Sequence, residues 1–177
     1  MPVSDLALLE ETAREAGEIA RSFWREDPQV WDKGGDDPVS EADFAVDTHL
    51  KQRLLAARPD YGWVSEETED DPARFQASRV FIVDPIDGTR SFVAGEKTWA
   101  HSIAVAEEGR VIAACVFLPV REKMYLAQSG GGAALNGEAI SAQKRETLEG
   151  ATVLSPKVSF RAEFWQDGPP DVLHVDK

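Results

Sequence analysis

Two aspartates three residues apart, Asp84 and Asp87, are followed directly by Gly88 and Thr89. Gly88 lets the backbone approach a ligand closely, and Thr89 supplies a hydroxyl group. A helix that began here would present free first-turn amides, which bind anions. Two carboxylates beside such amides indicate a hard divalent cation that bridges the protein to a phosphate group. For either aspartate alone we would favour a surface Asp-Pro turn before a capped helix, but the whole run favours the cation site.

The segments on either side of these aspartates must position them. The run Val80–Val83 is β-branched and aromatic, which predicts a short buried strand. Pro85 has no amide hydrogen and a fixed φ, so we expect the strand to end at Val83 and a stiff turn to follow. Residues 26–38 contain two prolines and two glycines and are predicted to be mostly loop, as are residues 68–78.

Two helices and an antiparallel meander are predicted around this segment. Ser4 or Asp5 can cap a first helix that ends near Phe23, and apolar side chains at helical spacing give that helix one buried face. Ser40 can cap a second helix, with Asp43 in the place of a capping-box acid. Strands are expected over residues 99–106, 110–118 and 123–127. These elements predict a layered α/β (α+β) fold with N-terminal helices packed on a mainly antiparallel sheet.

Composition restricts the classes of function. The chain has 177 residues, the size of one domain, and its 42% hydrophobic and 29% charged residues are ordinary for a soluble globular protein. A net charge of −13 argues against a nucleic acid polymer or an anionic membrane as partner, and an anionic substrate would need cations between it and the protein. The single cysteine, Cys115, lies in an apolar run and is expected to be a core thiol. No secretory signal or membrane-spanning run is visible, so we expect a cytoplasmic location.

The run D-P-I-D-G-T at residues 84–89 resembles the D-P-(I/L)-D-G-T motif of the inositol monophosphatase family. Members of that family are magnesium-dependent, lithium-sensitive phosphomonoesterases, and their relatives include 3'(2'),5'-bisphosphate nucleotidases, fructose-1,6-bisphosphatases and histidinol-phosphate phosphatases. Two further matches lie upstream in the same order as in the family. V-S-E-A-D at residues 39–43 resembles the V-(T/S)-x-x-D segment, and S-E-E at residues 65–67 resembles the (G/S)-E-E motif. Residues 130–137 resemble the family's glycine-rich hairpin, and we interpret them as a turn because the Lys-Ser/Thr of a nucleotide-binding loop is missing.

The resemblance implies a role for each residue of these motifs. It assigns two or three Mg2+ ions to the side chains of Glu66, Asp84 and Asp87 and to the carbonyl oxygen of Ile86. It implies that Asp43 accepts a hydrogen bond from Thr89, and that this pair and Glu66 orient and deprotonate the attacking water. The amides of Gly88 and Thr89 would bind phosphate oxygens.

The resemblance also distinguishes two adjacent glutamates. Neighbouring residues on a strand point to opposite faces, so only one of Glu66 and Glu67 can face a given site. The family motif assigns Glu66 to the metals and leaves Glu67, with the loop residue Lys33, in a supporting role. Without the resemblance, residues 66–71 would be a solvated acidic loop. Asp43 alone would be no more than a helix cap.

The resemblance covers about residues 5–155 and then fades. We expect residues 1–155 to form the metal-binding phosphatase domain and residues 156–177 to begin a truncated C-terminal portion. Family members continue into a second α/β domain with a W-D motif whose aspartate completes the metal site. The W-Q-D at residues 165–167 has the wrong spacing, and the G-P-P that follows excludes the helix that the motif needs. Loss of that half would expose an apolar inter-domain face, so pairing into a homodimer, or poor solubility, would follow.

The expected activity is Mg2+-dependent hydrolysis of a small phosphate monoester by metal-activated water. Inositol 1-phosphate is the first substrate that the motifs suggest. The alternative is 3'-phosphoadenosine 5'-phosphate, the substrate of a 3'(2'),5'-bisphosphate nucleotidase. A second alternative belongs to another class of protein: a truncated, catalytically weak or inactive remnant that serves as a metal-binding or dimerising module.

Overall fold

The computed structural model describes residues 3–35, 38–142, 144–155 and 157–175. The chain divides into two compact units, Met1–Ser141 and Ala142–Lys177. Every residue that the sequence singles out for chemistry belongs to the first unit. Within the described ranges, no helix is long and apolar enough to cross a membrane.

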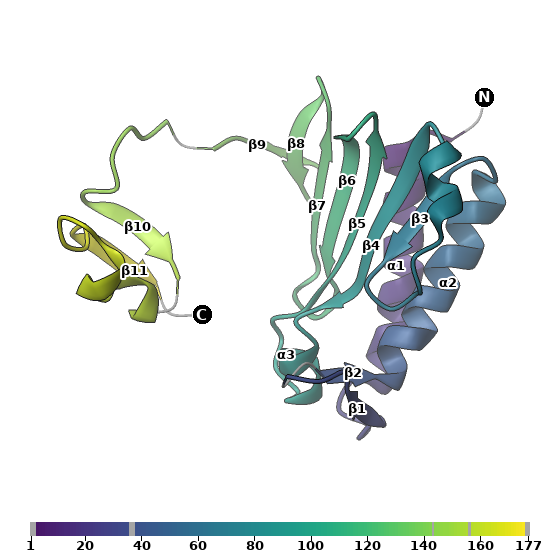
Figure 1. Cartoon of the computed structure of the whole chain (residues 1–177), viewed down its shortest axis with the longest axis horizontal. Helices are drawn as coiled ribbons and strands as arrows, with labels where there is room; N and C mark the ends of the chain where they lie inside the picture. The colour runs from purple at the N-terminus through teal and green to yellow at the C-terminus, as the bar shows by residue number, and fades with distance from the viewer. Residues whose placement is uncertain (1–2, 36–37, 143, 156, 176–177) are drawn as a thin grey trace. The chain divides into compact units, whose positions relative to one another are not determined.

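A seven-stranded sheet forms one layer of the first unit, in the spatial order β3-β4-β5-β6-β7-β8-β9 (Figure 1). The strands are β3 (Gly62–Ser65), β4 (Arg79–Asp87), β5 (Ala100–Glu107), β6 (Arg110–Leu118), β7 (Lys123–Gln128), β8 (Gly132–Leu135) and β9 (Glu138–Ile140). β3 runs parallel to β4, and every later pair is antiparallel. The β8–β9 hairpin turns at Asn136 and Gly137, which both have the positive φ that a two-residue hairpin turn needs. The predicted turn over residues 130–137 is thus confirmed only in part: turns lie at residues 129–131 and at Asn136 and Gly137, and the residues between them form β8.

Two long helices, α1 (Asp5–Phe23) and α2 (Glu41–Ala57), lie on one face of this sheet (Figure 1). Ser4 caps α1 as predicted, since its Oγ accepts the amide hydrogen of Ala7 at 3.2 Å. Gly17 lets α1 approach β6 closely, because a Cβ atom there would lie 2.7 Å from the ring of Phe117. The apolar helix face consists mainly of Leu8, Leu9, Ala13, Ala16, Ala20, Val46, Leu50 and Leu54, all buried. The predicted fold of helices packed on a mainly antiparallel sheet is confirmed.

The central strand β4 continues past the point where its end was predicted. It reaches Asp87, whereas we expected it to stop before Pro85. The prediction was wrong because the pairing with β5 shifts between Asp84 and Asp87, where two residues of β4 face one residue of β5. A bulge of this kind leaves a residue outside the regular ladder, so proline is tolerated there.

Two segments predicted as loop contain short elements. Within residues 26–38, β1 (Val30–Asp32) pairs antiparallel with β2 (Pro38–Ser40). Within residues 68–78, a 3-10 helix, η1, spans Pro72–Gln76. Elements of three to five residues are too short for a hydrophobic period to predict them.

The second unit is built on a parallel pair of strands, β10 (Ala151–Leu154) and β11 (Val172–Val175). Two single-turn 3-10 helices, η3 (Lys157–Phe160) and η4 (Ala162–Phe164), lie between them in the chain. The rings of Phe160 and Trp165 stack with their centroids 5.6 Å apart. One further 3-10 turn, η2 (Pro119–Arg121), belongs to the first unit and joins β6 to β7.

Candidate metal and phosphate site

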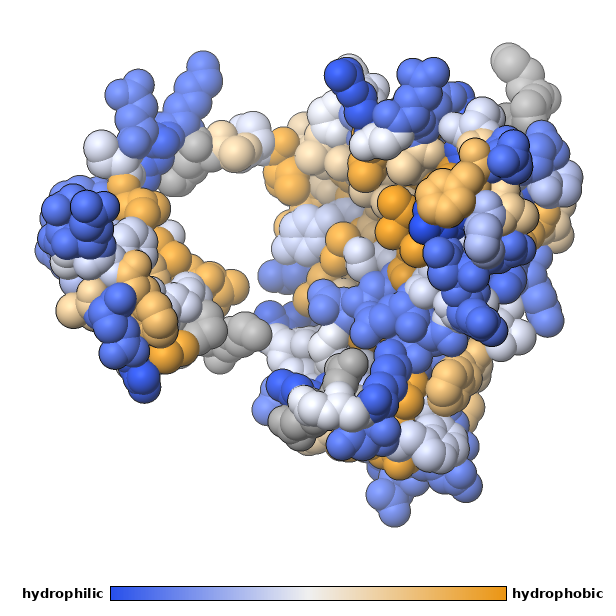
Figure 2. Space-filling model, in the orientation of Figure 1, coloured by the Kyte–Doolittle hydropathy of each residue, from blue (hydrophilic) through white to orange (hydrophobic). Residues whose placement is uncertain are grey.

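Four elements bring the predicted site residues to one end of the sheet (Figure 1). Because β3 and β4 are parallel, their carboxyl ends meet, and Ser65 lies beside Val83 in the register. Glu66 therefore follows β3 next to the end of β4, and its amide donates to the carbonyl of Val83 at 3.2 Å. The N-termini of α2 and of the short helix α3 (Thr89–Val93) lie at the same end. Figure 2 shows a hydrophilic area where this end of the sheet meets α3 and the β1–β2 hairpin.

Asp84 lies at the centre of a group of carboxylates. Burial of the carboxyl group, together with the negative charges of Glu66 and Asp87, raises the pKa of Asp84 to about 7. The negative charge of Asp43 also raises this pKa, and a hydrogen bond with Glu66 favours the protonated form of Asp84. Burial, and after it the neighbouring negative charges, disfavour the charged form of Asp84, and a bound divalent cation would offset both effects. The donors are all hard oxygens. The residues present therefore fit Mg2+.

The buried carboxylate of Asp43 joins α2 to α3. The side chain is 1% exposed, and its Oδ2 accepts from the amide and the hydroxyl of Ser40 at 2.8 and 2.5 Å. Its Oδ1 lies 3.2 Å from the hydroxyl oxygen of Thr89, which is also 3.0 Å from the carbonyl oxygen of Ile86. Burial raises the pKa of Asp43, and the hydrogen bonds from Ser40 and Thr89 oppose that shift. Asp43 is thus both the expected helix cap and a partner of Thr89.

The two adjacent glutamates differ in environment. The side chain of Glu67 is only 4% exposed, and its carboxylate accepts from Lys33 Nζ at 2.6 Å. Glu66 is 49% exposed and lies 3.5 Å from the same nitrogen. Burial raises the pKa of Glu67, against the lowering effect of Lys33. Glu67 is therefore held by the lysine, while Glu66 keeps access to solvent.

Gly88 forms the link between β4 and α3. Its φ is +88°, and a Cβ atom would lie 3.0 Å from the carbonyl oxygen of Thr98. No side chain fits there without strain, so the backbone conformation requires glycine. The first helical hydrogen bond of α3 runs from the amide of Phe92 to the carbonyl of Gly88 at 3.0 Å. The amides of Gly88 and Thr89 precede that bond, in the position from which a helix start binds an anion.

The carboxylates share one end of the sheet but do not form a finished metal cage. Among the described residues, no group of three or more His, Cys, Asp or Glu side chains is positioned to hold a metal ion as it stands. Glu66 lies 3.5 Å from Lys33 Nζ, and the pKa of Asp84 is raised by burial and by the charges of Glu66 and Asp87.

Sequence reasoning missed Asp47, which holds the loop that carries both glutamates. Asp47 is 7% exposed, and its two carboxylate oxygens accept from the hydroxyls of Ser65 and Thr68, on either side of Glu66 and Glu67. Asp47 lies four residues after Asp43 on α2, so both side chains project from the same helix face. That spacing was the available signal.

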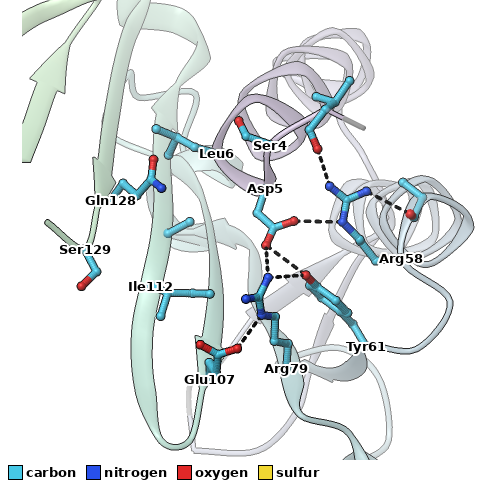
Figure 3. Close-up of a pocket in the computed structure, with 13 residues that line it drawn as sticks. Ser4, Asp5, Leu6, Arg58, Tyr61, Arg79, Glu107, Ile112, Gln128 and Ser129 are labelled. Carbon is cyan, nitrogen blue, oxygen red and sulfur yellow. Dashed lines mark hydrogen bonds and ion pairs between the residues drawn. The ribbon is translucent and has the colours of Figure 1, made fainter. Parts of the chain in front are cut away.

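A cavity of about 770 Å³ lies at the opposite end of the sheet from the carboxylates. Figure 3 shows Asp5 between Arg58 and Arg79 in this cavity. Asp5 accepts from Arg58 Nε at 2.9 Å and from an Arg79 nitrogen at 3.2 Å, and Arg79 Nε bonds Glu107 at 2.8 Å. The cavity is thus organised by paired charges that balance each other, and it lacks the unbalanced carboxylates of the site described above.

The sequence profile of the inositol monophosphatase family matches residues 3–166, nearly the whole chain. This chain belongs to the inositol monophosphatase family. The match extends past residue 155, where we expected it to fade. The chain is 37% identical over 141 residues to an inositol-1-monophosphatase of Rhizobium meliloti, which covers 80% of this chain and 50% of that protein. It is 32% identical over 173 residues to a histidinol-phosphatase of Chlorobaculum parvum, covering 97% of this chain and 66% of the relative.

A solved structure shares the fold. The inositol monophosphatase of Thermotoga maritima superimposes with a TM-score of 0.78 at 27% identity, over 94% of this chain and 65% of that protein. This chain therefore spans about half to two thirds of the length of the relatives that it matches. The two relatives named above are phosphatases by name, and the Thermotoga maritima structure shares the fold of the part of this chain that it matches.

Proposed function

We propose that this chain carries the metal-binding and water-activating part of a Mg2+-dependent phosphomonoesterase. The observation that supports this most directly is the meeting of the β3 and β4 carboxyl ends, which brings Glu66 beside Asp84 near the start of α3. Burial and the neighbouring carboxylates raise the pKa of Asp84 to about 7, in keeping with this crowding. Glu66, Asp84, Asp87 and the carbonyl of Ile86 would hold two or three Mg2+ ions. Bound Mg2+ would neutralise phosphate charge and lower the pKa of a water molecule.

The chain's own residues would orient and deprotonate that water. If the Thr89 hydroxyl donates its hydrogen to Asp43, the hydroxyl oxygen of Thr89 can accept a hydrogen bond from the water. Glu66, half-exposed at the end of β3, would take the proton. The amides of Gly88 and Thr89 would bind phosphate oxygens, and Lys33 with Glu67 would support the loop of Glu66.

Inositol 1-phosphate is the substrate that we propose first, because the motifs match that branch and the relative from Rhizobium meliloti is an inositol-1-monophosphatase. Histidinol phosphate is a second candidate, because the histidinol-phosphatase of Chlorobaculum parvum aligns with 97% of this chain. The bisphosphate nucleotidase substrate, 3'-phosphoadenosine 5'-phosphate, stays a prediction from the motifs. So do the cytoplasmic location and the homodimer.

The test is phosphate release by the purified chain from these three esters, with and without Mg2+. We expect Mg2+-dependent release from one of them, its loss in Asp87→Asn, and no change in Glu138→Gln, which alters an exposed acid on β9. Full activity in Asp87→Asn would contradict the assignment of the site. A folded chain that releases no phosphate from any ester would overturn the activity and favour the metal-binding remnant.

A further inference from the structure

The bulge in β4 places one buried histidine against the metal-binding segment. Between Asp84 and Asp87, two residues of β4 face only His101 on β5. His101 is fully buried, and its Nδ1 donates a hydrogen bond to the carbonyl oxygen of Pro85. That carbonyl lies where the regular ladder is interrupted, so the imidazole takes the place of a missing backbone partner.

We propose that His101 is a positioning residue that fixes the Pro85 carbonyl and thereby the shape of the segment Asp84–Thr89. Successive carbonyls of an extended strand point to opposite sides. With the Pro85 carbonyl held on the β5 side, the Ile86 carbonyl is directed to the other side, where Thr89 Oγ1 lies 3.0 Å away. His101 thus selects which carbonyl oxygen is offered to the site.

The chemistry of the imidazole fits a fixed donor. A carbonyl only accepts, so Nδ1 must carry the hydrogen. Nε2 is buried and has no hydrogen-bond partner among the described residues. The rings of Trp99 and Phe117 surround the imidazole, with centroids 5.7 and 6.4 Å away. Burial lowers the pKa of His101 to about 4, so the ring stays neutral and Nδ1–H persists at neutral pH.

A second contact, from the residues just before β5, lies at the other end of the segment. The carbonyl oxygen of Thr98 lies against Gly88, where a Cβ atom would be only 3.0 Å away. The segment is therefore held at Pro85 by a hydrogen bond and at Gly88 by close packing. Both contacts come from the four residues 98–101, so this short stretch anchors both ends of the site.

Two substitutions separate positioning from packing. His101→Leu fills the volume but has no donor, whereas His101→Asn leaves a gap but can place an amide nitrogen near the position of Nδ1. If His101 served packing alone, the leucine variant would disturb the segment Asp84–Thr89 less than the asparagine variant. A positioning role predicts the reverse. Cys115→Ala is the matched control, because Cys115 is equally buried, faces the helices from β6 and has no bond to the segment.

The experiment measures amide hydrogen exchange of residues 84–92 in the metal-free chain, and then Mg2+ affinity by calorimetry. We expect His101→Leu to accelerate exchange about tenfold and to weaken Mg2+ binding about tenfold, with His101→Asn close to wild type and Cys115→Ala unchanged in both. Amide exchange in His101→Leu that is as slow as in the wild type, or slower than in His101→Asn, would overturn the inference. The Mg2+ titration rests on the proposed function, and the exchange measurement does not. If the wild-type chain binds no Mg2+ but the variants keep the expected order of exchange rates, the proposed function is overturned and the positioning role of His101 is supported.

Discussion

The hydroxyl group of Thr89 has two acceptors but a single hydrogen. Its oxygen lies 3.2 Å from Asp43 Oδ1 and 3.0 Å from the Ile86 carbonyl, so it can donate to only one at a time. A cation on the Ile86 carbonyl would repel the hydroxyl hydrogen from that oxygen and favour donation to Asp43. The pair that we propose for water activation is therefore coupled to occupancy of the metal site.

This coupling makes the charge of Asp43 testable. In Asp43→Asn, the amide oxygen can still accept from Ser40, so the cap of α2 is largely kept. The charge that orients the Thr89 hydrogen is lost, and we expect phosphate release to fall about a hundredfold or more at nearly unchanged melting temperature. Ser4→Ala is the control: it removes the cap of α1, so it should reduce stability by about 1 kcal/mol and leave turnover within about threefold. Wild-type turnover in Asp43→Asn would contradict the role of the pair.

His101 gives the stability of the fold a defined pH dependence. Its pKa is about 4 when folded and 6.5 when exposed, so between pH 6.5 and 4 the unfolded chain binds the proton and the folded chain does not. Stability conferred at neutral pH is then lost as the pH falls from 6.5 to 4, by about 1.4 kcal/mol per pH unit. Urea unfolding of the wild type and His101→Leu between pH 7 and 5 measures this difference. Equal pH slopes in the two proteins would show that His101 is not buried as a neutral ring.

At the scale of elements, the site depends on where strands and helices end. The parallel pair β3–β4 brings Glu66 beside the end of β4, and α2 contributes Asp43 from its first turn. One turn further along α2, Asp47 accepts hydrogen bonds from the hydroxyls of Ser65 and Thr68, on either side of the glutamate pair. α2 therefore positions the glutamate loop as well as the Asp43–Thr89 pair.

Asp47→Ala should loosen that loop. Two hydroxyls that are partly buried would lose their acceptor, so we expect the free energy of unfolding to fall by about 1–3 kcal/mol. We also expect faster amide exchange at residues 65–68, because the hydroxyls of Ser65 and Thr68 fix this turn. Thr68→Val, which removes one of the two bonds, should show about half of each effect. Unchanged exchange at residues 65–68 in Asp47→Ala would mean that Asp47 does not position the loop.

The sequence predicted elements better than it predicted the contacts between them. The Ser4 cap, the Ser40–Asp43 cap and the strand boundaries of the meander follow from local chemistry, and the structure has them. The end of β4 was wrong because proline chemistry says nothing about a partner strand that shifts by one residue. The contact of Asp47 with Ser65 and that of His101 with Pro85 were not predicted, because each is made only in the folded chain, across 18 and 16 residues.

Within the first unit, the two ends of the sheet have different roles. The carboxylates lie where β3 and β4 end, whereas the network of Asp5, Arg58 and Arg79 lies where β4 begins. That network links α1, the end of α2 and β4, so its ion pairs stabilise the fold. Loss of the network should therefore affect stability and not the site.

Asp5→Asn tests this separation. It weakens the ion pairs of Arg58 and Arg79 with a side chain that is 13% exposed, and we expect a loss of about 1–3 kcal/mol in the free energy of unfolding. Mg2+ affinity measured well below the melting temperature should stay within about twofold of wild type. A large drop in Mg2+ affinity in the folded variant would show that the two ends are coupled.

Calorimetric titration of the chain with Mg2+ at constant ionic strength tests whether these carboxylates form a metal site. We expect saturable binding that Asp84→Asn and Asp87→Asn each weaken more than about tenfold, since even partners of metal ligands contribute about that much. Glu138→Gln should bind as the wild type does. No saturable binding by the folded chain, or unchanged binding in both aspartate variants, would contradict the claim that these carboxylates form the metal site.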